Sequence, residues 1–322
     1  MKTTRIAFIG AGEVAERHAE AIRECENAEL AGLWNRNRTR AEEKSARFGC
    51  QLYESPEALV ADPTVDAVFV LTDLETHHQY ARLALIAGKH VLVEKPVAAD
   101  AAQIRDLRDL AAEKGLWCVP GHNYIYEQGL MRTRAMLRAG KLGRLVSIHI
   151  LYNIAHAEDV AARYPGVIKQ IMTHHAYMLL YLAEPPVHLS ALKSTLHYKD
   201  ITQEDIAMVN LKLKNGALVH FGASFAADDH SGDPWTMMVK VIGTAGATRY
   251  SYRDWVEYSP GEAHSQTFLA YPQSIIGEVD YFVNHCLRRG LPPLSTMDDA
   301  LAAHEIVAAI ERSADTGETI AL

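Results

Sequence analysis

The sequence predicts an α/β protein: a doubly wound parallel sheet up to about residue 122, then an α+β domain with a large, mainly antiparallel open sheet. Apolar runs alternate with helical patterns in the first part, and the first run ends at a glycine-rich turn. Beyond residue 126 the runs alternate apolar and polar residues and are joined by short turns. We therefore expect domains at 1–122 and 123–322, with the last helix able to pack back on the first domain.

Composition narrows the class of partner. The 322 residues suffice for two domains, and contents of 48% hydrophobic and 22% charged residues are those of a soluble globular protein. A formal net charge of -8 argues against nucleic acid and against an anionic membrane surface, which leaves a small molecule. Without a signal-peptide pattern or a membrane-length apolar run, and with four dispersed cysteines that suit free thiols, a cytoplasmic location is expected.

The first predicted strand, 5–9, leads directly into a glycine turn and a helix. Gly10 permits a tight turn, and Gly12 lets backbone amides approach a pyrophosphate. Glu13 and Val14 open the helix, whose N-terminus then faces the phosphates. In this strand-and-helix context the turn predicts dinucleotide binding, whereas a merely close-packed turn is the alternative.

The second predicted strand, 30–34, ends in an arginine-rich turn. An acid that holds an adenosine ribose hydroxyl is expected about twenty residues beyond the glycines, yet residues 30–41 contain no Asp or Glu. Asn35 does not repel a phosphate, and Arg36 or Arg38 can pair with one. NADP is mildly favoured over NAD. Alternatively, the arginines lie in a solvated loop and Asn35 binds the ribose hydroxyls of NAD.

The third and fourth predicted strands bring further residues to the same sheet edge. Strand 67–71 ends at Leu71 and Thr72, and the next helix carries His77; these three are predicted to contact cofactor. After strand 90–93 come Glu94 and Lys95, then a proline that disfavours a helical Lys95.

Lys95 is placed where ligands bind in open α/β sheets, beyond the carboxyl ends of the strands. The alternative is an ordinary solvated loop lysine. The first domain continues with a capping-box pattern at Asp100 and Gln103, which predicts a helix, and closes with a strand at 117–119.

The second half is predicted from alternating patterns. Residues 209–213 and 219–225 alternate on either side of Asn215-Gly216, which is a hairpin signal. Further strands are expected at 145–151, 187–196, 235–242 and 247–252, and helices at 168–182, 275–287 and 298–313. A sheet with helices on one face follows.

These motifs together resemble the Gfo/Idh/MocA family of oxidoreductases over nearly the whole chain, and Glu94-Lys95-Pro96 is the most specific element. The resemblance implies an N-terminal Rossmann NAD(P)-binding domain and a second domain for substrate binding and oligomerisation, often as a homodimer or homotetramer through its sheet. It implies hydride transfer between nicotinamide and a carbinol or carbonyl carbon of a sugar, sugar derivative or polyol. Lys95 corresponds to the lysine that holds the substrate hydroxyl beside the nicotinamide.

That role for Lys95 agrees with the chemistry. A hydride leaves a carbinol carbon as the hydroxyl proton departs, so a base must lie within hydrogen-bond reach of that oxygen. Enclosure and the positive ring of the oxidised cofactor would both lower the pKa of this lysine.

The family also carries a histidine flanked by two acids on the first helix of the second domain. Here the best alignment puts His174 in the histidine position, with Gln170 and Tyr177 in place of the carboxylates. These three residues share one helical face. A shift by one residue would select His175 instead, and a hydrogen-bonded core histidine is the remaining alternative.

Other residues are predicted to line the substrate site. The family's Arg-Phe after the linker strand is replaced by residues 121–126, which offer tyrosine hydroxyls and so favour a neutral sugar or cyclitol. The predicted wall consists of Tyr124, Tyr126, Tyr152 and Asn153, with Gln170, His174, His175 and Tyr177. Asn123 is assigned to the cofactor. Core or interface packing is an equal alternative for the tyrosines.

Three other functions compete with a dehydrogenase. A redox glycosidase of the same family would cleave a glycosidic bond with tightly held NAD and no net turnover of cofactor. A cofactor-binding sensor would keep the fold without the chemistry, although retention of Lys95 argues against it. A metal-dependent hydrolase using His156, His174 and His175 is disfavoured, because adjacent residues on a helix point about 100° apart; no metal is predicted.

Overall fold

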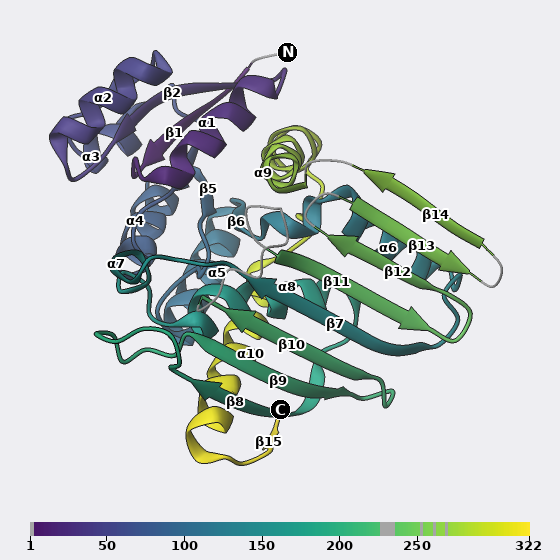
Figure 1. Cartoon of the computed structure of the whole chain (residues 1–322). Helices are drawn as coiled ribbons and strands as arrows, with labels where there is room; N and C mark the ends of the chain where they lie inside the picture. The colour runs from purple at the N-terminus through teal and green to yellow at the C-terminus, as the bar shows by residue number, and fades with distance from the viewer. Residues whose placement is uncertain (1–2, 226–235, 252–253, 260–261, 268–269) are drawn as a thin grey trace. The chain divides into compact units, whose positions relative to one another are not determined.

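The computed structural model describes residues 3–225, 236–251, 254–259, 262–267 and 270–322. The chain forms two compact units, each described here by itself (Figure 1). Unit 1 contains residues 1–126 and 272–301, and unit 2 contains residues 127–271 and 302–322. The single boundary predicted at residue 122 differs from this division, since 272–301 joins the N-terminal residues. The indole Nε1 of Trp117 donates to the Cys286 carbonyl and Asn27 donates to Asn284, which attaches this segment to unit 1.

Unit 1 is built on a six-stranded sheet in the order β3-β2-β1-β4-β5-β6. Every pairing between neighbouring strands is parallel. The strands are β1 (Thr4–Ile9), β2 (Ala28–Trp34), β3 (Gln51–Leu52), β4 (Ala67–Val70), β5 (His90–Val93) and β6 (Cys118–Pro120). This order and direction confirm the predicted doubly wound parallel sheet. The two-residue β3 is too short to produce an alternating pattern and was not predicted.

Helices separate these strands in the chain. They are α1 (Glu13–Glu24), α2 (Arg38–Phe48), α3 (Pro56–Ala61), α4 (Leu74–Ile86) and α5 (Ala101–Lys114), followed by the short η1 (Asn123–Tyr126). The predicted capping box is present at α5, because the Asp100 side chain accepts a hydrogen bond from the Gln103 backbone N–H at 2.9 Å. In return, the Gln103 side chain accepts from the Ala99 N–H.

The core of unit 1 includes a group of aromatic side chains on one side of the central strands. Phe8 and Phe69 stack with ring centroids 5.8 Å apart, and Phe282 meets Phe69 at 5.7 Å. Phe282 lies in η3 (Tyr281–Leu287), which continues α9 (Ala270–Asp280). The predicted helix at 275–287 is therefore present, and its apolar side covers the parallel sheet.

Unit 2 is built on a nine-stranded sheet in the order β14-β13-β12-β11-β7-β10-β9-β8-β15. The strands are β7 (Leu145–Asn153), β8 (Pro186–Ser194), β9 (Ile206–Leu213), β10 (Leu218–Ser224), β11 (Thr236–Gly243), β12 (Ala247–Ser251), β13 (Asp254–Ser259), β14 (Glu262–Thr267) and β15 (Ile320–Ala321). Only β7 and β10 pair in parallel within this sheet, as far as the described residues show. The sheet is thus mainly antiparallel, as predicted; Trp235 and Tyr252 of two predicted strands lie outside the described residues.

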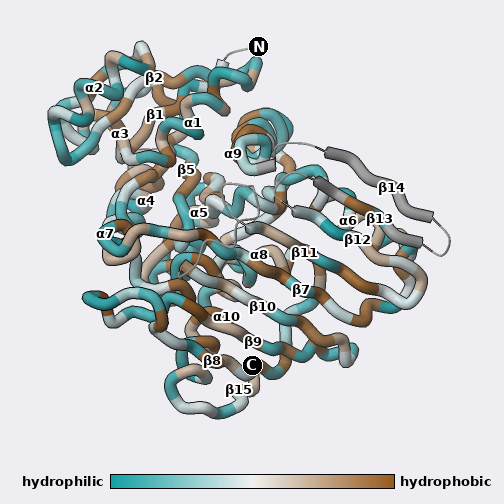
Figure 2. The backbone as a smooth tube through the Cα atoms, in the orientation of Figure 1, coloured by the Kyte–Doolittle hydropathy of each residue, from teal (hydrophilic) through white to brown (hydrophobic). Residues whose placement is uncertain are grey.

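The hairpin of β9 and β10 turns where the sequence predicts. Gly216 has a φ of +88°, which favours glycine, and the Asn215 side chain accepts from the Ala217 N–H. Along β9, buried positions alternate with more exposed ones, and Figure 2 shows that hydropathy varies along the strands of this sheet. One face of the sheet is therefore covered and the other is open.

Helices of unit 2 are α6 (Gln128–Arg138), α7 (Glu158–Ala161), the π-helical turn η2 (Ile168–Met172) with α8 (Thr173–Leu182), and the second part of α10 (Met297–Thr316). Helix α6 was not predicted. Of the helices that the structure describes, none is long and apolar enough to cross a membrane.

Candidate active site

The glycine turn joins three strands of unit 1 at their carboxyl ends. Gly10 has a φ of +110°, and a Cβ there would collide with the Leu71 carbonyl oxygen at the end of β4. The next residue, Ala11, donates its backbone N–H to the Asn35 side chain after β2 at 3.1 Å. This hydrogen bond fixes the Asn35 side chain against the glycine turn, so contacts within the fold account for its position.

The start of α1 fits a dinucleotide. Apart from Gly12 itself and its two chain neighbours, no heavy atom of the described residues lies within 4 Å of the place where a Cβ on Gly12 would stand, so packing within the chain does not require glycine there. Gly12 is also the N-cap of α1 and makes no side-chain cap bond, which leaves the amides of Glu13 and Val14 at an uncapped helix N-terminus. Open space and uncapped amides are what a pyrophosphate needs.

His77 connects two loops at the same sheet edge. The residue is buried, its Nε2 lies 2.9 Å from the Thr72 carbonyl oxygen, and its Nδ1 lies 2.8 Å from the Pro96 carbonyl oxygen. It therefore ties the segment after β4 to the segment that carries Lys95. Its predicted contact with cofactor stays a prediction.

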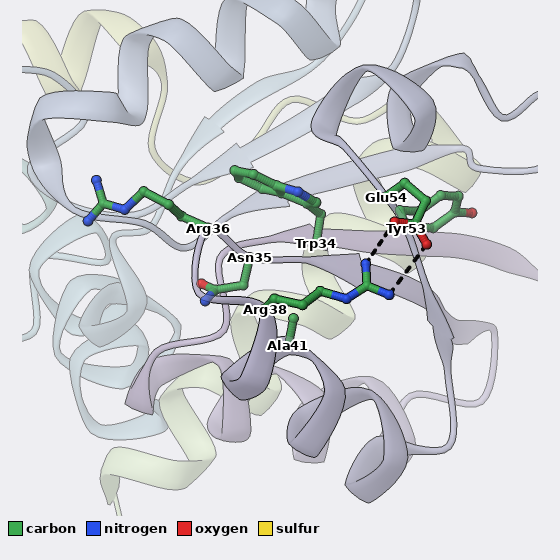
Figure 3. Close-up of a pocket in the computed structure, with 7 residues that line it drawn as sticks. All are labelled: Trp34, Asn35, Arg36, Arg38, Ala41, Tyr53 and Glu54. Carbon is green, nitrogen blue, oxygen red and sulfur yellow. Dashed lines mark hydrogen bonds and ion pairs between the residues drawn. The ribbon is translucent and has the colours of Figure 1, made fainter.

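A pocket of about 380 Å³ lies at the end of β2. Figure 3 shows the Arg38 guanidinium turned toward Glu54, with which it makes bonds of 2.9 and 3.4 Å. Arg38 also bonds Glu42 one helical turn later at 2.9 Å. Arg36 is 82% exposed and lies 3.7 Å from Asp73. The pocket thus contains two arginines and a carboxylate, and it is lined by Trp34, Asn35, Arg36, Arg38, Ala41, Tyr53 and Glu54.

Lys95 lies just beyond β5, and the Lys95–Pro96 peptide is cis. Burial lowers the pKa of its ammonium group to about 8, although the neighbouring Glu94 charge acts in the opposite direction. A lysine with this pKa exchanges its proton near neutral pH, as a general acid or base must.

Glu94 is held by two polar contacts next to Lys95. Its Oε1 lies 3.0 Å from Nε2 of His18 on α1, and its Oε2 accepts from the Lys95 backbone N–H at 3.0 Å. Burial alone would raise the pKa of this carboxyl, but the His18 hydrogen bond and the His18 and Lys95 charges hold that pKa below its usual range. Gly121 packs against it, since a Cβ there would lie 3.4 Å from the Glu94 Cδ. The loop after β6 therefore packs against Glu94.

Sequence reasoning missed two residues of this neighbourhood, His18 and Glu278. His18 lies on α1, and its partner Glu94 lies 76 positions away in the chain. Glu278 is 1% exposed on α9. One signal for it was available: an acid standing between Ile275 and Phe282 interrupts the apolar stripe of a predicted helix.

The predicted residues after β6 are buried in unit 1. Asn123 donates to the Ser274 hydroxyl at 2.8 Å, and the rings of Tyr126 and Tyr281 lie 5.6 Å apart. Tyr124 is fully buried. These positions favour packing for the aromatic rings, and their predicted contacts with cofactor or substrate stay predictions.

In unit 2, three of the residues predicted to line the substrate site lie close together. The Nδ1 of His174 lies 2.7 Å from the Tyr177 hydroxyl, and the Tyr152 ring lies 5.8 Å from the His174 ring. Asn153 follows Tyr152 as the last residue of β7, and Gln170 lies in the π-helical turn before α8. His174, Tyr177 and Tyr152 therefore form one cluster.

His175 points to a different environment. It is fully buried, its ring packs 5.2 Å from that of Phe221, and neither ring nitrogen has a hydrogen-bond partner among the described residues. Burial, together with the charge of His220, lowers its pKa to about 3. This environment favours His174 over His175 as the histidine available for chemistry.

Two family models match the chain. Residues 4–122 match the model described as "Oxidoreductase family, NAD-binding Rossmann fold", and residues 130–249 match the model described as "GFO/IDH/MocA C-terminal domain". These matches cover most of both predicted domains.

Individual proteins are similar to the chain over different lengths. An inositol 2-dehydrogenase of Rhizobium meliloti (strain 1021) is 24% identical over 97% of this chain and 97% of its own length. A dTDP-3,4-didehydro-2,6-dideoxy-alpha-D-glucose 3-reductase of Streptomyces violaceoruber is 30% identical over 51% of this chain and 48% of its own, so that match spans about half of the relative. Among solved structures, a levoglucosan dehydrogenase in complex with NADH and levoglucosan has a TM-score of 0.91 at 19% identity, covering 100% of this chain and 99% of the other. At that identity the likeness confirms the fold.

Proposed function

Because the chain belongs to the GFO/IDH/MocA family of NAD-binding oxidoreductases, we propose that it transfers hydride between a nicotinamide cofactor and a carbinol or carbonyl carbon of a sugar, sugar derivative or polyol. The observation that carries the proposal is Lys95. A lysine whose pKa falls to about 8 lies at the end of β5, on the same sheet edge as an uncapped, open helix N-terminus that suits a pyrophosphate.

The dinucleotide, when bound, accepts or returns the hydride. In the oxidation, the Lys95 amine takes the proton of the substrate hydroxyl as the carbon–hydrogen bond breaks; in the reduction, the Lys95 ammonium gives that proton back to the forming alkoxide. Glu94 bonds to the Lys95 backbone N–H and holds a negative charge beside it, which keeps the pKa of Lys95 from falling further. Without that charge the lysine would be a weaker base.

In unit 2, the residue proposed to take part in the chemistry is His174. Its hydrogen bond with Tyr177 fixes the imidazole ring, as an acid or base requires, while Tyr152 covers one side of it. The family's acids are absent here, and Tyr177 is a neutral partner. We assign His174 to assist proton transfer and place the neutral substrate's hydroxyls near Tyr152 and Asn153; sugars and polyols fit because this group carries no fixed charge.

The choice between NAD and NADP rests on the pocket at the end of β2. The preference for NADP predicted from the arginines stays a prediction. Arg38 forms ion pairs with Glu42 and Glu54, and a 2′-phosphate would have to displace these carboxylates, which weakens the preference. Arg36, which is mostly exposed, is the arginine left to meet a 2′-phosphate. We propose that both cofactors bind and that Glu54 restrains binding of NADP.

Titration of NADH and NADPH fluorescence tests the cofactor proposal. Because the Arg38–Glu54 pair is exposed, its removal is worth at most about 1 kcal/mol. Glu54→Gln should therefore tighten NADPH binding relative to NADH by up to about 5-fold, and Glu113→Gln, at an exposed position of α5, should leave the ratio unchanged. An unchanged ratio in Glu54→Gln would remove Glu54 from the proposal.

The open face of the unit 2 sheet supports assembly into a homodimer or homotetramer. Cross-strand pairing places Leu192 of β8 opposite Met208 of β9, and Met208 opposite Gly222 of β10. The row continues through Leu151 of β7 to Met238 of β11. Leu192 is 74% and Met208 is 54% exposed. A contiguous apolar row on an open sheet face is typical of a protein interface.

Light scattering of Met208→Glu tests that proposal, with Gln79→Glu on an exposed turn of α4 as the control. The first variant should shift toward monomer and the control should keep the wild-type mass. A cytoplasmic location stays a prediction.

A screen of cyclitols, free hexoses and anhydro sugars with NAD and with NADP, followed at the absorbance of the reduced nicotinamide, tests the main proposal. Steady production of reduced cofactor is expected and would also exclude the redox glycosidase, which returns its hydride in each cycle. If neither dinucleotide binds, the proposal is wrong.

A further inference from the structure

Glu278 is a buried acid without a partner. It lies on α9 within unit 1, is 1% exposed, and neither carboxyl oxygen has a hydrogen-bond partner among the described residues. An unpaired buried carboxyl of this kind destabilises a fold, and native proteins seldom retain one without a function.

Packing of α9 and η3 on the parallel sheet places Glu278 in the neighbourhood of Glu94. One helical turn further along, Phe282 packs on the Phe69 ring of β4, with ring centroids 5.7 Å apart. The His18 ring also lies 5.5 Å from the Phe69 ring, and His18 bonds Glu94 through Nε2. Gly277, the residue before Glu278, packs against Tyr126, since a Cβ on Gly277 would lie 3.0 Å from the Tyr126 carbonyl oxygen.

Burial and a neighbouring charge both favour the protonated form of this acid. Burial, and after it the Glu94 charge, raise the pKa of Glu278 well above its usual range, which favours the neutral carboxylic acid. The charge that acts on Glu278 is that of Glu94, which in turn interacts with His18, Lys95 and His122. Burial lowers the pKa of His122 to about 3, so His122 stays neutral and its Nδ1 pairs with the Ser295 hydroxyl. On its own helix, Asp280 accepts from Asn284 instead.

When two neighbouring carboxyls together carry one negative charge, a positive charge that arrives beside them favours loss of the remaining proton. Glu94 is ionised and bonded to His18, so Glu278 is the member that holds the proton. A cation arriving beside Lys95 would favour the doubly ionised pair over the singly ionised one. Reduction of that cation to a neutral group would restore the proton.

We propose that Glu278 is a proton-holding residue linked to the redox state of the cofactor: its carboxyl releases a proton to solvent when the oxidised, positively charged nicotinamide binds, and keeps that proton when the neutral reduced form binds. This inference rests on the proposed function. The step balances as one Glu278 carboxylic acid giving one carboxylate and one proton, and it makes no covalent bond. Glu278 acts through the charge balance at Glu94 and Lys95 and is therefore a positioning residue.

Calorimetric titration in two buffers of different ionisation enthalpy counts the protons released on binding. At pH 6.5, NAD⁺ should release more protons than NADH from the wild-type protein. Glu278→Gln should lower that difference by up to one proton, while the matched Glu113→Gln variant, at an exposed position of α5, should match the wild type. Lys95→Met removes any proton released by Lys95, so the difference in proton release that remains in this variant should be that of Glu278.

The outcomes separate this inference from the function on which it rests. If Glu278→Gln binds both forms and releases as many protons as the wild type, the inference is overturned and cofactor binding stands. If the wild type binds no dinucleotide, both fail. Should Glu278→Gln not fold, infrared difference spectra of the wild type with NAD⁺ and with NADH decide: a protonated-carboxyl band that shifts with ¹³C-glutamate labelling must be weaker in the NAD⁺ complex, and an unchanged band contradicts the inference.

Discussion

The two units hold their proposed site residues in different ways. In unit 1, Asn35, His77 and Glu94 bond to backbone groups at the ends of parallel strands, so the sheet topology itself fixes them. In unit 2, His174 and His175 are neighbours on one helix, and only rotation about the helix axis decides which one meets Tyr177 and which one packs on Phe221. A site at strand ends therefore follows from topology, whereas a site on a helix face depends on packing.

The largest expected effect tests the strand-end site. Lys95→Met removes the group that exchanges the hydroxyl proton, so kcat should fall about 10²- to 10⁴-fold while the Kd for NADH changes by less than about 3-fold. Lys114→Met, an exposed lysine at the end of α5, is the matched control. A Lys95→Met enzyme with near-normal kcat would place the chemistry elsewhere.

The helix-face site is tested by a pair of variants. His174→Ala should lower kcat/KM about 10²-fold, since it removes a positioned acid or base. His175→Leu replaces an unpaired buried imidazole with an apolar side chain, which is nearly neutral or stabilising for the fold, and should reduce kcat/KM much less. The reverse order of effects would show that the alignment is shifted by one residue.

The pH dependence of the reaction sharpens the role of Lys95. Because its pKa is lowered to about 8, the amine is the minor form at pH 7 and the major form above pH 8. The kcat/KM for oxidation should rise with pH through an apparent pKa at or below about 8, since the positive nicotinamide lowers it further. The rate of reduction should fall over the same range. A pH-independent oxidation rate between pH 6 and 9 would contradict this role.

A smaller effect concerns the stability of unit 1. The pKa of Glu278 is raised in the folded state, so the folded protein keeps a proton that the unfolded chain loses above about pH 4.3. The free energy of unfolding of the wild type should therefore fall as pH rises. The free energy of unfolding of Glu278→Gln should rise relative to that of the wild type by about 1.4 kcal/mol per pH unit, until the folded carboxyl ionises. Urea unfolding of both proteins between pH 4.5 and 8 measures this; a difference that stays constant with pH would mean that Glu278 is not the titrating group.

Much of unit 1 could be predicted because its signals are local. The glycine turn, the strand that ends at Lys95 and the capping box at Asp100 each occupy a few consecutive residues. The hairpin at Asn215 and Gly216 was predictable for the same reason. The parallel pairing of β10 with β7 was not, because it joins segments that no turn connects.

The missing parts of the site depend on distant pairs. Arg38 was predicted in an arginine-rich turn after the second strand, whereas it begins α2 and bonds Glu54, 16 positions away. His18 and Glu94 are brought together only when α1 packs on the sheet. Glu278 stood in a helix that was predicted, yet its neighbourhood depends on 272–301 joining the N-terminal unit.

Transfer of deuterium from a carbon-deuterated polyol or sugar to the nicotinamide tests the central claim most directly. The account predicts that the wild-type protein forms labelled reduced cofactor, and that Lys95→Met binds the cofactor but does not label it at a comparable rate. Labelling by Lys95→Met at the wild-type rate would contradict the role of Lys95, and failure of the wild type to bind either dinucleotide would contradict the proposed function.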